Sequence, residues 1–222
     1  MGEITIFAEI KSKTKKMNKN EKFVITINRE LGSGGRTIGR KLAERLGVKY
    51  YDKAVIQGLT EKYGLTVEEI ERLKAQKKQS WWSEMQEHYK SLLHSDYQEK
   101  PSTSAMFETE RRILEGIANE ESCVVAGRSG FLIFREWKNS LHVFIKASTE
   151  YRIERLMKKQ GLTYAAALDT IDMVDEGREA YLKKYSDRSR YDARNYDMVL
   201  SMDGMTEDDA VAVIMEYVER KK

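Results

Sequence analysis

The stretch FVITINRELGSGGRT, residues 23–37, joins a short apolar run, a glycine-rich segment and the start of a helix pattern. Residues 23–27 are apolar, rich in β-branched side chains and bounded by polar residues, which predicts a buried strand. After the glycines, leucine and isoleucine recur four residues apart, which predicts a helix over 37–46. A strand, a glycine loop and a helix in this order form a cradle for an anion, because the helix N-terminus carries unpaired N–H donors.

Strands and helices alternate along the rest of the chain. Short apolar runs predict four further strands, at 48–51, 122–126, 141–145 and 197–201. Amphipathic or capped segments between and after them predict helices at 53–63, 66–79, 104–121, 149–160, 164–185 and 206–221. Helices between successive strands imply crossover connections and a parallel sheet. Ligands of such sheets bind beyond the carboxyl ends of the strands.

Composition excludes several classes of protein. The chain has 222 residues, of which 41% are hydrophobic and 34% charged, with a net charge of +3. This balance is typical of one folded domain and does not indicate a nucleic-acid partner. The single cysteine excludes an internal disulfide and a thiolate metal site, and favours a reducing, cytoplasmic location. The longest apolar run, Ala210 to Met215, is far shorter than the ~18 residues of a membrane-spanning helix.

Two segments differ from the rest of the chain. Residues 1–22 carry six lysines between Lys11 and Lys22 and are expected to form a basic tail or extension ahead of a single domain over 23–222. Residues 80–103 show no clear period and contain the only proline. They are expected to be the most mobile part of the body.

The glycine loop departs from the usual P-loop pattern, in which glycine and four further residues precede Gly-Lys-Ser/Thr. If Gly34 is the second glycine, Arg29 takes the place of the first and Gly35 takes the place of the lysine. Arg36 or Arg29 could then supply the positive charge, since guanidinium geometry suits phosphate. Glu30 would repel a phosphate nearby, so it is expected to pair with an arginine or to hold a metal ion.

Charged residues follow the other strands. Asp52 ends the second strand and is either a ligand contact or the N-cap of the next helix. Arg128 follows the third strand directly after a glycine. Beyond the fourth strand, two groups at helical spacing are candidates for a lid over phosphates: Arg152, Arg155 and Lys159, and then Asp172, Asp175 and Arg178.

Taken in series, these motifs resemble the cytidylate kinase-like family of P-loop proteins, which is related to the nucleoside monophosphate kinases. The resemblance covers residues 23–218 and rests on the segments ITINRELGSGGR (25–36), Tyr51-Asp52, VVAGR (124–128) and VFIKA (143–147), followed by Arg152 and Arg155. True cytidylate kinases read Asp-Gly-Arg-Asp at the third strand, whereas this chain reads Ala126-Gly127-Arg128-Ser129. Selection of a cytosine nucleotide is therefore left open.

The resemblance implies a three-layer α/β/α fold of the nucleoside monophosphate kinase type, with a five-stranded parallel sheet. It implies an acceptor-side insertion over about 53–121 and a lid over about 148–190. The implied activity is transfer of the γ-phosphoryl group of ATP, with Mg²⁺, to a nucleotide or another small phosphorylated acceptor. No nucleic acid or membrane partner is implied, and the oligomeric state is left open.

The same resemblance suggests roles for individual residues. The donor phosphates would contact Gly32, Ser33, Gly34, Gly35, Arg36 and Thr37, with Thr37 also a magnesium ligand. The acceptor would contact Asp52, Arg128, Asp175 and Arg178. Catalytic roles would fall to Arg36, Arg128, Arg152 and Arg155. The alternative is a nucleotide-binding module without phosphoryl transfer, favoured by the missing lysine. A nicotinamide-dependent oxidoreductase is disfavoured, because the loop lacks the spaced three-glycine pattern.

Overall fold

The computed structural model describes residues 21–52, 56 and 104–220 of the chain. The predicted helices at 53–63 and 66–79, the basic tail over 1–22 and the mobile segment at 80–103 lie wholly or almost wholly outside these residues, so they stay predictions. The strands and helices of the described part are, in chain order, β1 (Val24–Arg29), α1 (Gly35–Leu46), β2 (Lys49–Asp52), α5 (Ser104–Glu120), β3 (Cys123–Ala126), α6 (Gly130–Ile133), β4 (Ser140–Lys146), α7 (Thr149–Gln160), α8 (Tyr164–Lys183), the 3₁₀ helix η1 (Ala193–Asn195), β5 (Met198–Ser201) and α9 (Glu207–Arg220).

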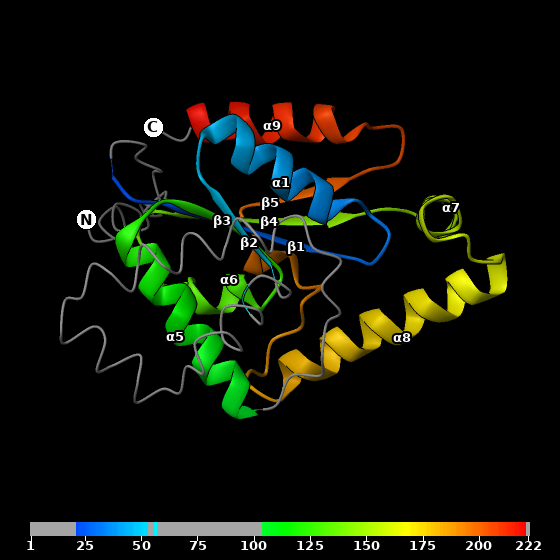
Figure 1. Cartoon of the computed structure of the whole chain (residues 1–222), viewed down its shortest axis with the longest axis horizontal. Helices are drawn as coiled ribbons and strands as arrows, with labels where there is room; N and C mark the ends of the chain where they lie inside the picture. The colour runs from blue at the N-terminus through cyan, green and yellow to red at the C-terminus, as the bar shows by residue number, and fades with distance from the viewer. Residues whose placement is uncertain (1–20, 53–55, 57–103, 221–222) are drawn as a thin grey trace, which may run out of the picture.

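The five strands form one parallel sheet, as predicted, and their order is β2-β3-β1-β4-β5 (Figure 1). The first strand is central and pairs with β3 on one side and β4 on the other. In register, Ile27 lies beside Ala126 and beside Val143. The segments that follow β1 and β3 therefore emerge next to each other at one edge of the sheet.

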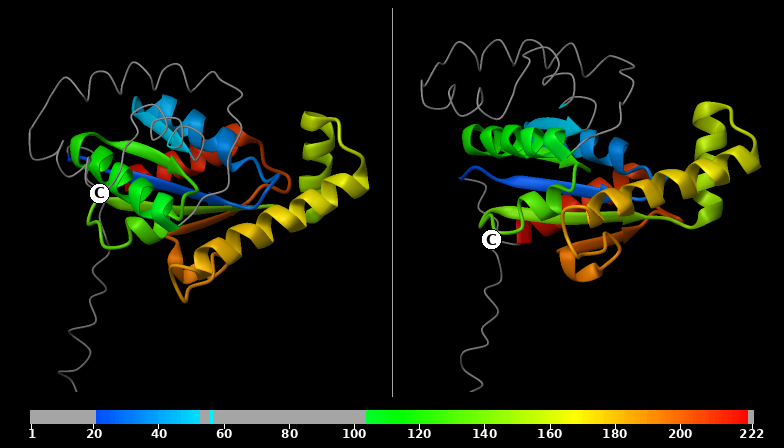
Figure 2. Two further views of the ribbon diagram at one scale, coloured as in Figure 1. Left: turned by 60° about the horizontal axis from the view of Figure 1, so that its bottom comes forward. Right: turned by 90° about the horizontal axis from the view of Figure 1, so that it is seen from below.

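Helices cover both faces of the sheet and make the three predicted layers. Figure 1 shows α1 and α9 on one face and α5 and α6 on the other, and Figure 2 shows the same layers from two further sides. Figure 1 shows α7 beyond the carboxyl ends of the strands and α8 running back from there below the sheet toward α5, and α7 packs on α8. The site is consequently bounded by the sheet edge on one side and by this helix pair on the other.

The main core lies between the sheet and the α1–α9 layer. It consists of aliphatic side chains whose exposed fractions are 0 or 1%, among them Ile25, Ile27, Ile38, Leu42, Val143, Ile145, Val211 and Ile214. Their burial fixes the register of β1 and the first turns of α1, which are the two elements that flank the glycine loop.

Element boundaries differ from the sequence predictions at functionally important points. The first strand runs two residues further than predicted, through Arg29, and α1 begins at Gly35 rather than at 37. Neither α6 nor η1 was predicted, since elements of four and three residues carry no helical period. Across residues 21–52, 56 and 104–220, no helix is long and apolar enough to cross a membrane.

Candidate functional site

The glycine loop between β1 and α1 is stabilised by the buried side chain of Ser33. Gly32 and Gly34 have φ angles of 83° and 91°, which favour glycine. The buried Ser33 hydroxyl lies 2.9 Å from the carbonyl oxygen of Glu30 and 3.1 Å from that of Ile145, so Ser33 braces the loop. Gly34 is the N-cap of α1 and offers no capping side chain. The first N–H groups of the helix are thus left to an external acceptor.

Arg36 points away from the loop. Its Nε lies 3.2 Å from Oδ2 of Asp52, which is only 1% exposed at the end of β2. The Tyr50 hydroxyl donates to the same oxygen over 3.3 Å. Burial, and then the Asp52 carboxylate, raise the pKa of Tyr50. The expectation that Arg36 replaces the P-loop lysine stays a prediction. In this structure the Arg36 guanidinium lies beside Asp52 at the carboxyl end of β2.

Arg152 of α7 fastens the helix pair to the glycine loop. Its Nε donates to the carbonyl oxygen of Leu31 over 2.7 Å, and its Nη1 lies 3.8 Å from Oε2 of Glu30. Glu30 also accepts from the N–H of Ala147 over 3.1 Å. Glu30 therefore faces an arginine, which is one of the two alternatives expected of it. This contact offsets the negative charge of Glu30 near the glycine loop.

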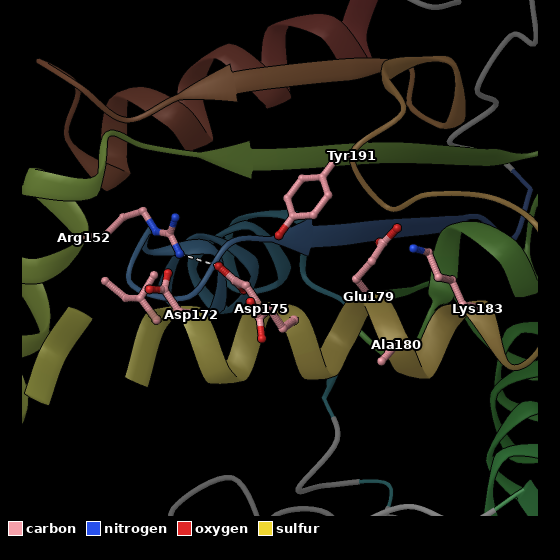
Figure 3. A pocket seen from close by; sticks show the side chains of 9 residues that line it. Arg152, Asp172, Asp175, Glu179, Ala180, Lys183 and Tyr191 are labelled. Carbon is pink, nitrogen blue, oxygen red and sulfur yellow. Dashed lines mark hydrogen bonds and ion pairs between the residues drawn. The ribbon is translucent and has the colours of Figure 1, made fainter. Parts of the chain in front are cut away.

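Asp175 of α8 collects the strongest set of polar contacts in the described part of the site. Its carboxylate pairs with Arg152, as the dashed line in Figure 3 shows. It also accepts from the N–H of Leu31 over 3.0 Å, from Nη1 of Arg178 over 3.0 Å and from Nη1 of Arg190 over 3.3 Å. With 8% of its side chain exposed, Asp175 locks α8 onto the glycine loop.

Arg155 of α7 reaches over the glycine loop. Its Nη2 donates to Oγ1 of Thr37 over 3.2 Å and lies 2.7 Å from a carboxylate oxygen of Glu207. A Cβ added to Gly34 would lie 3.5 Å from its Cζ. A guanidinium in this place suits anionic phosphates and opposes a dication at Thr37. The Thr37 hydroxyl is occupied by Arg155 in this conformation, and its role as a magnesium ligand stays a prediction.

A cavity of about 360 Å³ opens where β1 and β3 end. Its described lining includes four arginines and no carboxylate: Arg29, Arg128, Arg178 and Arg190. Burial, and then the neighbouring charges of Arg29 and Arg190, lower the pKa of Arg178 to about 9. Like charges crowded in this way indicate a site for an anion.

The turn after β3 has an unusual backbone. Gly127, Arg128 and Ser129 have φ angles of 78°, 54° and 50°, so three consecutive residues are left-handed. Non-glycine residues in this region cost free energy and cluster at functional sites. The turn directs Arg128 to the buried Glu110 of α5, with which it forms an ion pair, and to the hydroxyl of Tyr181 at 3.4 Å.

A second cavity, of about 420 Å³, lies along α8 (Figure 3). Its described lining carries four carboxylates, those of Asp172, Asp175, Glu176 and Glu179, against two cations, Arg152 and Lys183. This charge balance disfavours phosphate. Of the predicted residues, Asp175 lies between the two cavities and Asp172 faces only the acidic one.

Three site residues were not recognised in the sequence. Arg190 is 2% exposed, contacts Asp175 and donates to the carbonyl oxygen of Arg29, yet it lies in an irregular segment without a motif. Tyr181 and Glu110 occupy ordinary helix positions. In the sequence, only their spacing along a buried helix face could have indicated them, and many residues that merely pack share this spacing.

Comparison with known proteins agrees with this geometry. The model of the cytidylate kinase-like family matches residues 24–204. A cytidylate kinase of Archaeoglobus fulgidus is 28% identical over 207 residues, covering 89% of this chain and 96% of that protein. The crystal structure of an uncharacterized protein from Eubacterium ventriosum superposes with a TM-score of 0.64 at 22% identity, covering 89% and 98% of the two chains. A uronate isomerase of Corynebacterium glutamicum is 31% identical over 111 residues, but this chain spans only 21% of its length.

Proposed function

Since the chain belongs to the cytidylate kinase-like family, a group of kinase-type phosphotransferases, we propose that it transfers the γ-phosphoryl group of ATP to a small phosphorylated acceptor. The cytidylate kinases to which it is similar make CMP the first acceptor to test. The observation that carries the proposal is the meeting of two anion sites at one sheet edge. The glycine loop with the N-terminus of α1 adjoins a cavity lined by four arginines.

The proposed chemistry needs positioned charges rather than an acid–base pair. A phosphate oxygen of the acceptor is already anionic and attacks the γ-phosphorus. The new P–O bond forms as the bond from the γ-phosphorus to the β–γ bridging oxygen breaks, and ADP departs with that electron pair. The protein must hold the two anions in line and offset their repulsion.

Each group of residues has one task in this scheme. Backbone N–H groups over 32–37 hold the donor phosphates. Arg155, already over the loop, clamps the transferring group. Arg128 and Arg178 hold the acceptor phosphate in the arginine-lined cavity. Asp52 remains a predicted acceptor contact. Arg152 and Asp175 keep α7 and α8 in place and act as positioning residues.

Magnesium enters this proposal through the nucleotide. Mg²⁺ bound with phosphates keeps several waters and needs few protein ligands. Because Arg155 donates to the Thr37 hydroxyl, we assign no step to a metal ion on Thr37.

The alternative function is a nucleotide-binding module without turnover. One observation favours it: Gly35 stands where the loop lysine is expected, and Arg36 is engaged by Asp52. The two functions differ in a single measurement, which is whether bound ATP is consumed when an acceptor is added.

A coupled assay of ATP consumption with Mg²⁺ tests the proposal. The acceptor panel begins with CMP and continues through the other nucleoside monophosphates and small phosphorylated metabolites. We expect acceptor-dependent release of ADP, and a kcat/KM that falls about 10- to 100-fold in Arg178→Met, because one charge-assisted contact to phosphate is lost.

Arg135→Met is the matched control. Arg135 is 49% exposed, pairs with the exposed Glu136 and lies outside both cavities. Its kcat/KM should equal that of the wild type. ATP binding without ADP release on any acceptor would replace the kinase with the binding module.

A further inference from the structure

We propose that Arg29 is the cation that meets the donor phosphates of this chain, in place of the missing loop lysine, and that Gly35 is a glycine because Arg29 passes over it; Arg29 also passes over Gly127, whose φ of 78° favours glycine independently. The inference rests on the proposed function in one respect, which is that the glycine loop binds ATP.

Gly35 leaves room for the stem of Arg29. It is buried in the first turn of α1 and is absent from the residues with positive φ, so its backbone does not require glycine. A Cβ at this position would lie 2.6 Å from Cβ of Arg29, 2.9 Å from its Cγ and 3.5 Å from its Cδ. Any longer side chain at 35 would compete with Arg29 for the same space. The absence of a lysine at position 35 is therefore linked to the presence of an arginine at position 29, because only one of the two side chains fits this space.

Gly127 leaves room for the head of the same side chain. A Cβ added there would overlap Nη1 of Arg29 and would lie 3.2 Å from its Cζ. Gly127 follows β3, whereas Gly35 begins α1. The Arg29 side chain thus runs from the start of the donor helix to the turn that begins the acceptor cavity. In the proposed reaction, a cation on this path would lie between the donor and the acceptor phosphate.

The other three arginines near the glycine loop are held by other parts of the structure. Arg36 lies on Asp52 at the far strand end, and Arg152 is fastened to Asp175 and the carbonyl of Leu31. Arg155 approaches from the lid helix, so its position depends on α7. Arg29 alone among these four belongs to the central strand β1, and its carbonyl oxygen accepts from Arg178 and Arg190. Its backbone is consequently fixed before any ligand arrives.

Arg29→Met tests the charge while it preserves the stem that fills the room above Gly35. The Kd for ATP with Mg²⁺, measured by calorimetry, should rise about 10- to 100-fold, because a charge-assisted contact to phosphate is lost. The melting temperature should stay near that of the wild type, which separates loss of binding from loss of fold. Arg45→Met, at the exposed C-terminal end of α1, removes the same charge and should leave the Kd unchanged.

Position 35 supplies an independent test by double substitution. Gly35→Lys alone should lower the melting temperature, since the new Cβ overlaps the Arg29 stem. Arg29→Gly with Gly35→Lys should melt higher than Gly35→Lys and bind ATP at least about tenfold more tightly than Arg29→Gly, because removing the Cβ and stem of residue 29 gives the lysine both room and charge. This coupling is expected only if the two side chains share one place.

The outcomes separate this inference from the function on which it rests. An ATP Kd that is equal in the wild type and Arg29→Met, with loss in Arg36→Met instead, would overturn the inference and leave the kinase proposal standing. Additive effects of the substitutions at 29 and 35 would also overturn it. A wild-type chain that does not bind ATP at all would overturn the proposed function itself. Binding without transfer would remove the kinase while the role of Arg29 in binding survived.

Discussion

Asp175 accepts from groups in three different parts of the chain besides its own helix. They are the N–H of Leu31, the guanidinium of Arg152 and that of Arg190, and Arg178 on the same helix adds a fourth contact. Removing a single carboxylate would leave several buried cations without compensation. Buried ion pairs broken from one side are much more costly than exposed ones.

We therefore expect Asp175→Asn to reduce the free energy of unfolding by about 3–5 kcal/mol. Urea unfolding followed by circular dichroism measures it. Asp172→Asn removes an exposed carboxylate from the same helix and should cost less than about 0.5 kcal/mol. Equal effects of the two substitutions would contradict the central role of Asp175.

The lowered pKa of Arg178 predicts an unusual pH dependence. With a pKa of about 9, the arginine is charged below pH 9 and becomes neutral above it. The charged groups that face it are Arg29, Arg190 and Asp175. Affinity for an acceptor phosphate should thus be constant from pH 7 to about 8.5 and then fall, by at most about tenfold per pH unit. Isothermal titration with the acceptor over this range measures it.

Arg178→Met is the control for this titration. Its affinity should be low at neutral pH and nearly flat up to about pH 10, where lysines begin to titrate. A wild-type affinity that stays constant to pH 10.5 would show that Arg178 stays charged over this range and would contradict the lowered pKa.

Single residues of the site differ in how far the sequence reveals them. Arg152, Arg155, Asp175 and Arg178 could be singled out because they lie at helical spacing after a strand. Arg190 could not, since its place beside Asp175 is set by the fold of an irregular segment. The left-handed turn at Arg128 and Ser129 was equally invisible, because neither residue type favours that conformation.

At the scale of elements, α7 rests on the glycine loop through Gly32. A Cβ at Gly32 would lie 2.8 Å from the carbonyl oxygen of Arg152, and its φ is 83°. The loop and α7 approach each other through backbone atoms, which cannot move aside independently. Space and conformation both oppose a side chain here.

Gly32→Ala should accordingly cost more than an equivalent change elsewhere. Gly161→Ala is the matched control, because Gly161 has a φ of 68° and a Cβ there would meet nothing within 4 Å. We expect about 1–2 kcal/mol for Gly161→Ala from backbone strain and at least about 1 kcal/mol more for Gly32→Ala. Chemical denaturation of both variants gives the difference. Equal costs would mean that α7 does not press on the loop.

The elements themselves were largely predictable. Each of the five strands contains a short run of apolar or aromatic residues next to polar or glycine residues, and each long helix has a period or a cap. The two-residue extension of β1 was missed because Asn28 and Arg29 are polar. They continue the ladder beside Phe144 and Ile145, so pairing with β4 rather than side-chain character sets that boundary.

At the scale of the whole molecule, a net charge of +3 conceals a local excess of positive charge at the sheet edge. Inorganic phosphate should therefore raise the melting temperature more than sodium chloride at equal ionic strength. For a Kd near 1 mM, 10 mM phosphate adds about 1.4 kcal/mol, or roughly 3–6 °C for a chain of this size. Scanning calorimetry measures the shift. An equal shift in Arg178→Met would place the anion outside the arginine-lined cavity.

The position of β1 at the centre of the sheet also has a consequence for synthesis on the ribosome. Thr26 of β1 and His142 of β4 are 116 residues apart. At roughly 5–20 residues per second, about 6 to 23 s pass between the translation of these two strands. Throughout that interval the apolar β1 has no neighbouring strand on its β4 side. The nascent chain is consequently a candidate for chaperone binding at its N-terminal half, before Arg178 and Arg190 of the arginine-lined cavity are translated.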